Sequence, residues 1–134
     1  MRAHLFTSLG ALKIGMDILL KDEDVKLDKL LGHGGLFKTP VVGQATVAAA
    51  VNTPVSVMKT AGEGGAWGIA LLASYLKDKE NNFTLAEFLS KKVFAGYVSE
   101  EIDPEQKDVE GFEQFIARYK KGIPIEQAAV DNLI

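Results

Sequence analysis

Glycine is concentrated in one part of this chain of 134 residues. Eight of its thirteen glycines lie between positions 32 and 68, most of them in two clusters that each follow a short apolar segment. Glycine accepts backbone conformations with positive φ and leaves room for another backbone or a ligand, because it has no Cβ. The glycines therefore predict two tight turns, which limit where the strands and helices of the chain can lie.

The segments around the glycines alternate between strand-like and helix-like patterns. Short strands are predicted over residues 25–31 and 55–58, and helices over 2–21 and 40–51. A third helix is predicted to begin at residue 63 or 66 and to end at 77. This alternation is typical of an α/β fold with parallel strands, whose ligands bind beyond the carboxyl ends of the strands. Both glycine clusters follow a predicted strand, so we expect any binding site to lie at these turns.

The second half of the chain predicts helices joined by polar segments. Thr84 and Glu87 have the spacing of a capping box, which opens a short helix. Acidic residues crowd positions 99–110, and this charge predicts a solvated loop. A further helix is expected to stop at Gly122, and a last short helix is expected to open at Pro124.

The composition narrows the class of protein. The length fits one domain, in which we expect an α/β part over residues 1–80 and a helical tail over 81–134. The chain has no cysteine, which excludes a disulfide scaffold, a thiolate metal site and a cysteine nucleophile. Its two histidines do not make a histidine-rich zinc site, and we predict no metal ligands. The net charge of −3 weighs against a nucleic-acid partner.

Residues 5–20 are apolar enough to be tested as a signal peptide or a membrane helix. Thr7, Ser8, Lys13 and Asp17 interrupt this stretch, and no small-residue cleavage site follows it. The stretch is also short for a transmembrane helix. Its leucines recur at helical spacing, which indicates an amphipathic helix facing a core. We therefore expect no membrane partner and a cytoplasmic location.

On the residues alone, each glycine turn has two interpretations. Gly34 and Gly35 could let a phosphate or a ribose approach the backbone, or could simply form a tight turn between strand and helix. The spacing matches neither the dinucleotide-binding fingerprint nor the phosphate-binding loop. In the second turn, Glu63 could cap the following helix, and Trp67 could flank a ligand or belong to the core.

The residues of both turns resemble one family. The run Leu30-Leu31-Gly32-His33-Gly34-Gly35, followed by Lys38-Thr39 and Gln44, is similar to the adenosine motif in the C-terminal domain of the FGGY carbohydrate kinases. Residues 63–72 resemble the family's closing Glu-x-x-x-x-Gly-Ala-Ala stretch. The tail over residues 122–129 looks closest to members that act as xylulokinases or ribulokinases.

The resemblance implies a fold, an activity and a site. The fold would be part of a ribonuclease H-like (actin-like ATPase) domain, and the activity would be phosphoryl transfer from ATP with Mg²⁺ to a pentulose or similar sugar. Gly35 and Thr39 would line the nucleotide site, Gly34 would shape the turn, and Lys38 would lie at the rim or be a solvated surface lysine. Gln44 is expected to be structural. The sugar pocket and the general base would lie upstream, so we assign no catalytic residue and expect no sugar phosphorylation by the isolated chain.

A second class of function stays open beside the kinase. A chain with this fold but without the chemistry would be a non-catalytic helical binding or oligomerisation module. Two short strands make a marginal sheet, and an unpaired edge invites pairing with another strand. We therefore expect the first strand to find its neighbour elsewhere, in a second copy of the chain, in a partner chain or in an upstream segment.

Overall fold

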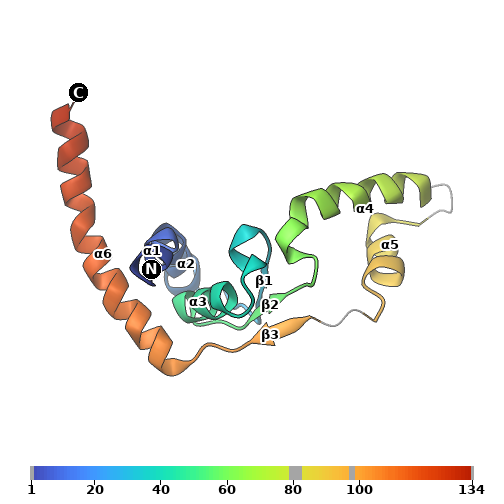
Figure 1. The fold of residues 1–134 in the computed structure, drawn as a ribbon, viewed down its shortest axis with the longest axis horizontal. Helices are drawn as coiled ribbons and strands as arrows, with labels where there is room; N and C mark the ends of the chain where they lie inside the picture. The colour runs from blue at the N-terminus through green and yellow to red at the C-terminus, as the bar shows by residue number, and fades with distance from the viewer. Residues whose placement is uncertain (1, 79–82, 97–98, 134) are drawn as a thin grey trace.

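Three short strands form one sheet within residues 2–78, 83–96 and 99–133, which are the residues that the computed structural model describes. Strand β1 (Leu30–Gly32) pairs in parallel with β2 (Val55–Val57), and β3 (Glu100–Ile102) pairs antiparallel with the other edge of β2. The predicted parallel pair is confirmed, although β1 occupies only the last part of the segment expected over 25–31. The sheet is therefore mixed, as Figure 1 shows, and β1 ends it on one side.

Strand β3 corrects the solvated loop predicted over residues 99–110. Its Glu101 carboxylate accepts a hydrogen bond from the Ser56 hydroxyl and one from the Lys29 ammonium, both at 2.7 Å. The two bonds link Glu101 to β2 and to Lys29, the residue just before β1. They also hold the pKa of the Glu101 carboxyl below the usual range, mainly through Lys29. The acidic run looked solvated because its partner lies 72 positions earlier in the chain.

The predicted helix over residues 2–21 is divided in two. Helix α1 (Arg2–Ser8) and helix α2 (Gly10–Asp17) meet at Leu9, and the chain bends there by 44° before the π-helical turn η1 (Ile18–Asp22). Phe6 and Leu9 are buried at the bend. In the described part of the chain no single helix is long and apolar enough to cross a membrane, and only this bent pair passes on length and composition together.

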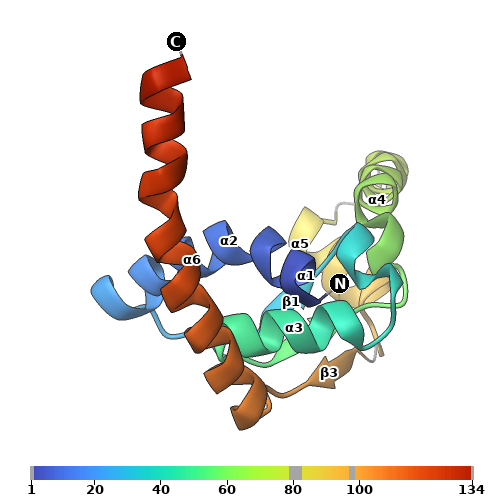
Figure 2. The same ribbon diagram turned by 60° about the vertical axis from the view of Figure 1, so that its left-hand side comes forward.

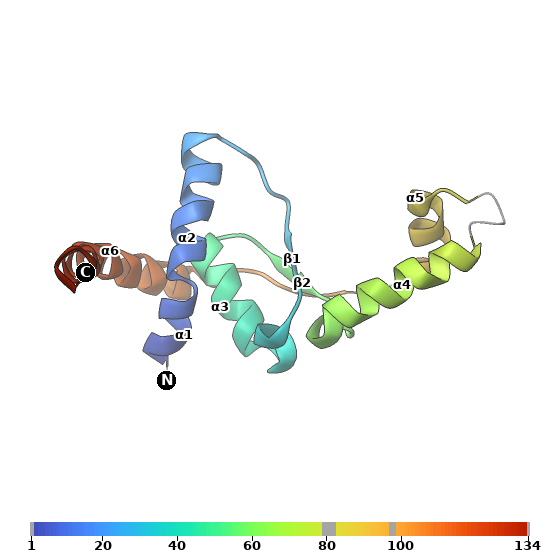
Figure 3. The ribbon, with the colours of Figure 1, turned by 90° about the horizontal axis from the view of Figure 1, so that it is seen from above.

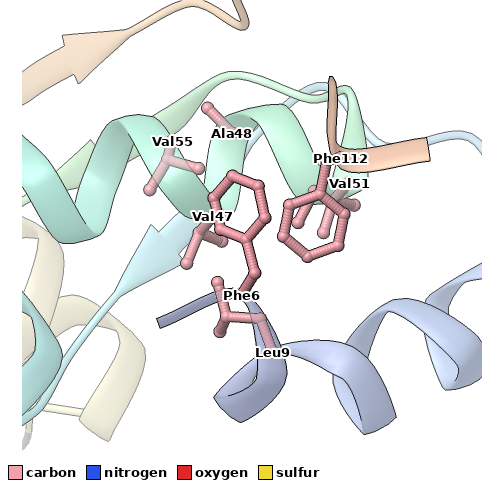
Figure 4. Packing of buried hydrophobic residues seen from close by; sticks show 8 residues of the cluster. Phe6, Leu9, Val47, Ala48, Val51, Val55 and Phe112 are labelled. Carbon is pink, nitrogen blue, oxygen red and sulfur yellow. The ribbon is translucent and has the colours of Figure 1, made fainter. Parts of the chain in front are cut away.

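Helix α3 (Val42–Val51) lies between the sheet and the pair α1–α2 (Figure 3). Its Val47, Ala48 and Val51 are all buried, which explains why the segment carries almost no charge. Figure 4 shows them packed with Phe6 of α1 and with a phenylalanine of α6, Phe112. The two phenylalanine rings lie 4.8 Å apart, a favourable distance for an aromatic pair.

Helix α6 runs without a break from Gln106 to Leu133, so the predicted stop at Gly122 and the new start at Pro124 are wrong. Pro124 lacks the N–H that would bond to the carbonyl of Lys120, and the helix loses one hydrogen bond there without ending. The first half of α6 packs on the core, whereas the second half projects from the body (Figure 2). The packing on the core therefore positions the whole helix.

Helices α4 (Gly64–Asp78) and α5 (Leu85–Phe88), with the π-helical turn η5 (Leu89–Val93), form an arm at the other end of the molecule (Figure 1). The capping box between Thr84 and Glu87 is confirmed. The expected boundary between an α/β part and a tail at residue 80 lies outside the described residues, which omit 79–82. Because β3 completes the sheet, the second part of the chain is not purely helical.

A close approach at Gly43 ties α3 to the turn after β1. A Cβ at position 43 would collide with the backbone carbonyl of Leu36. We expect Gly43→Ala to lower the free energy of unfolding by about 2 kcal/mol or more, because overpacking against backbone cannot relax by a side-chain rotation. Urea unfolding followed by far-ultraviolet circular dichroism measures this.

Gly111→Ala is the matched control for that substitution. Gly111 is also helical, but nothing lies within 4 Å of a Cβ at that position. The control should raise the free energy of unfolding by about 0.5–1 kcal/mol, as alanine does in a helix interior. Equal effects of the two variants would contradict the close approach at Gly43.

Candidate functional site

The two glycine turns meet at the carboxyl ends of β1 and β2. The 3₁₀ turn η2 (Gly35–Lys38) follows β1, and the 3₁₀ turn η3 (Ala61–Glu63) follows β2. Gly34 has a φ of +103°, a conformation that favours glycine, and its N–H donates to the carbonyl of Ala61 at 2.7 Å. This hydrogen bond joins the turns, as expected for turns that follow neighbouring parallel strands.

A pocket of about 430 Å³ opens between these turns, the start of α3 and the end of β2. Its apolar lining includes Phe37, Met58 and Ala61, of which Met58 and Ala61 are buried. Its polar lining includes Lys38 and Thr39. The pocket therefore offers a buried apolar wall and a polar rim to a single ligand.

Lys38 and Glu63 form an ion pair across the rim of this pocket. The Lys38 ammonium donates to a carboxylate oxygen of Glu63 at 2.7 Å, with the two side chains 57% and 75% exposed. The lysine stem lies over Gly62, where a Cβ would stand 3.1 Å from the Lys38 Cγ. The hydrogen bond and the charge of Lys38 lower the pKa of the Glu63 carboxyl, so this group is ionised at neutral pH.

The rim of the pocket also contains a strained turn. The N–H of Val42 donates to the carbonyl of Pro40 at 2.8 Å, and Val41 between them has φ +68° and ψ −49°. These values describe a γ-turn of the rare, strained type. A β-branched residue makes the conformation more costly, and such strain persists only where the surrounding structure imposes it.

The four residues expected to bind the nucleotide fall into two groups. Lys38 and Thr39 line the pocket, whereas Gly34 and Gly35 lie one turn earlier and are not part of its lining. The Gly34 N–H is already bonded to Ala61, but the space above Gly35 is open, with nothing within 4 Å of a Cβ there. Gly34 thus shapes the turn, and Gly35 leaves its backbone accessible.

Two other residues singled out in the sequence have structural positions. Gln44 is buried, and its amide nitrogen donates to the carbonyl of Val55 at 2.6 Å and to that of Glu100 at 2.9 Å. It is structural, as expected. Trp67 packs edge-on against Phe94 at 5.9 Å and does not line the pocket.

Sequence reasoning missed two features of the pocket. Glu63 was interpreted as a helix cap, and only its pairing with Lys38 places it at the rim. Glu100 lines the pocket from β3, a strand that the sequence did not indicate. No local sequence signal places Glu63 or Glu100 at the pocket, because both positions depend on contacts between distant parts of the chain. Across the described ranges, no group of three or more histidine, aspartate or glutamate side chains is placed to hold a metal ion.

The ion pair at the rim predicts a titration. The usual pKa of the Glu63 carboxyl is 4.5. Since the folded-state value is lower, the pair stabilises the fold above pH 4.5, and this contribution is lost as the pH falls through the folded-state pKa. We expect Lys38→Met to return the pKa of Glu63 to its usual value, as measured by carboxyl-carbon NMR during a pH titration.

Lys26→Met is the control for the charge change. Lys26 pairs with Asp24 at 2.6 Å and lies outside the pocket lining, so its loss should leave the pKa of Glu63 depressed. A Glu63 pKa that is depressed equally in the Lys38 variant would rule out the ion pair in solution.

One protein family matches the part of the chain that contains both glycine turns. The family described as "FGGY family of carbohydrate kinases, C-terminal domain" matches residues 1–76, which include β1, β2 and both glycine turns. No curated protein and no solved structure matches the chain. The match covers more than half of the 134 residues. The chain therefore belongs to the FGGY family of carbohydrate kinases, as part of the C-terminal domain.

Proposed function

We propose that this chain supplies one wall of the ATP cleft of a sugar kinase, which transfers a phosphoryl group from ATP to a hydroxyl of a pentulose or similar sugar. The observation that carries the proposal is the pocket at the carboxyl ends of β1 and β2. Both glycine turns border this pocket, and both lie within the residues that match the kinase family. Parallel α/β sheets bind their ligands at this edge.

The chemistry of the pocket suits a nucleotide. The apolar wall of Phe37, Met58 and Ala61 offers a surface for the adenine ring. The Thr39 hydroxyl can donate or accept a hydrogen bond, and the Lys38 ammonium has donors beyond the one that Glu63 uses. The open space at Gly35 lets a phosphate or a ribose approach the backbone.

The described residues leave other parts of the reaction to groups elsewhere. Phosphoryl transfer needs a residue that orients the sugar hydroxyl and carboxylates that hold Mg²⁺. The family implies ATP with Mg²⁺. The pocket lining has two carboxylates, Glu63 and Glu100, and Glu63 is paired with Lys38, so the described residues offer no set of three metal ligands there. We propose that the base and the sugar pocket lie outside these residues. The likeness of residues 122–129 to xylulokinases and ribulokinases supports a pentulose, and we propose a cytoplasmic enzyme.

ATP binding to the 134-residue chain is the first test. We expect saturable binding by isothermal titration calorimetry, which Gly35→Val should weaken about tenfold or more because its side chain fills the open approach to the backbone. Thr39→Ala should weaken binding about two- to tenfold, the range of one neutral hydrogen bond. Gly15→Val and Thr7→Ala are matched controls, because both positions lie outside the pocket and Gly15 has open space around it.

The same preparation tests whether the general base lies outside these residues. With MgATP and pentulose sugars, the chain alone should release no ADP above background in a coupled assay. Sugar phosphorylation by the isolated chain would contradict the absence of a base from these residues. Unaltered ATP affinity in both the Gly35→Val and the Thr39→Ala variant would contradict the nucleotide wall itself.

One observation favours the second function, a non-catalytic binding or oligomerisation module. In the described part of the chain no strand pairs with the outer edge of β1, and Leu31 on this strand is 64% exposed. Helix α4 likewise exposes Ile69, Leu72 and Leu76. An open strand edge beside apolar side chains favours pairing with a second chain.

Self-association through this edge predicts a molar mass that rises with protein concentration in light scattering. Leu31→Lys should shift the equilibrium toward the monomer, because a lysine on an edge strand opposes pairing. Leu12→Lys, on an exposed leucine of α2, is the control and should leave the molar mass unchanged. A monomer at every concentration would exclude this mode of association.

A further inference from the structure

We propose that Glu63 recognises the ribose of the nucleotide: its carboxylate accepts hydrogen bonds from the vicinal 2′- and 3′-hydroxyls, so the pocket selects ribonucleotides over deoxyribonucleotides. The inference rests on the proposed function and names a specificity-determining residue for it. Three properties of Glu63 carry it, namely its place on the rim, its fixed orientation and its charge.

Glu63 stands at the mouth of the pocket rather than on its inner wall. Its side chain is 75% exposed, whereas Met58 and Ala61 of the same lining are 8% and 1% exposed. On the apolar wall of Phe37, Met58 and Ala61, the partly exposed Phe37 offers the apolar area that an adenine ring can remove from water. A base on that wall directs its ribose toward the mouth, where Glu63 lies.

The carboxylate of Glu63 is held in place by a residue of the other glycine turn. One of its oxygens accepts from the Lys38 ammonium at 2.7 Å. The lysine stem is itself supported over Gly62. This hydrogen bond uses one oxygen of the carboxylate, and the other oxygen can accept from a ligand in the pocket. A group fixed before binding loses little conformational freedom when a ligand arrives.

The charge of Glu63 selects the part of the ligand that can lie beside it. An ionised carboxylate only accepts hydrogen bonds, and it repels the phosphate groups. The donors of ATP are the two ribose hydroxyls and the amine of the adenine ring. The two neighbouring hydroxyls of a ribose match the spacing of the two oxygens of a carboxylate. In ATP the ribose lies between the base and the phosphates. With the base on the apolar wall and the phosphates toward solvent, the ribose would lie at the level of Glu63.

Calorimetric titration of the 134-residue chain with ATP, 2′-deoxy-ATP, 3′-deoxy-ATP and ITP tests this. Wild type should bind each deoxy nucleotide about five- to tenfold more weakly than ATP, below the full effect of a charged hydrogen bond because the site is exposed. ITP, which lacks the amine, should bind like ATP. Glu63→Ala should bind ATP as weakly as wild type binds the deoxy nucleotides, and should no longer distinguish them.

Two further variants complete the design. Glu63→Gln keeps the size and one acceptor oxygen, and should retain part of the preference for ATP. Glu126→Ala, an exposed glutamate on α6 far from the pocket, should bind like wild type. Thermal unfolding by circular dichroism confirms that each variant is folded.

The outcomes separate the inference from the proposed function. Equal binding of ATP and both deoxy nucleotides by wild type would overturn the role of Glu63 and leave the ATP wall standing. A Glu63→Ala variant that still prefers ATP to the deoxy nucleotides would also overturn the role of Glu63. Weak binding of ITP alone would overturn it too, because it would place the carboxylate at the adenine amine. A wild-type chain that binds none of the nucleotides would overturn the proposed function, and the inference with it.

Discussion

The buried amide of Gln44 is the contact on which the arrangement of helix, sheet and pocket depends. The Gln44 side chain extends from α3, and its amide nitrogen donates to two backbone carbonyls, that of Val55 in β2 and that of Glu100 in β3. Two strands of three residues each make few bonds of their own, so a side chain that bonds to both fixes their position relative to the helix. An apolar residue here would lose both hydrogen bonds, the one to Val55 buried and the one to Glu100 part-buried, at a cost of about 0.5–1.5 kcal/mol for each.

The position of α3 in turn imposes the strained turn at the rim. Gly43 lets the helix approach the carbonyl of Leu36, and the core residues of α3 fix its other end. The chain between Thr39 and Val42 must then reverse within a very short span, and Val41 adopts its positive φ to do so. The packing of the helix therefore maintains a conformation that valine alone would avoid.

The sequence predicts those features whose causes are local. Glycine clusters after apolar segments identify both turns, and the alternation of patterns predicts the parallel pair of β1 and β2. The capping box at Thr84 depends on a partner three residues away, and it is present. Lys38 and Thr39 lie in the pocket because they follow the first turn directly. In each case the residues that determine the structure are neighbours in the chain.

Features that depend on distant partners were not predicted. Strand β3 forms because Glu101 bonds to Ser56 and Lys29, and composition alone cannot distinguish such a strand from a solvated acidic loop. Helix α6 passes Gly122 and Pro124, two residues that usually mark an end. The position of Glu63 at the rim depends on its pairing with Lys38, 25 positions earlier. The pocket unites both kinds of feature, since Glu100 of β3 lies beyond the residues that match the kinase family and still forms part of its lining. The pocket therefore depends on chain outside the matched segment, and removal of that chain would open the pocket on the side of β3.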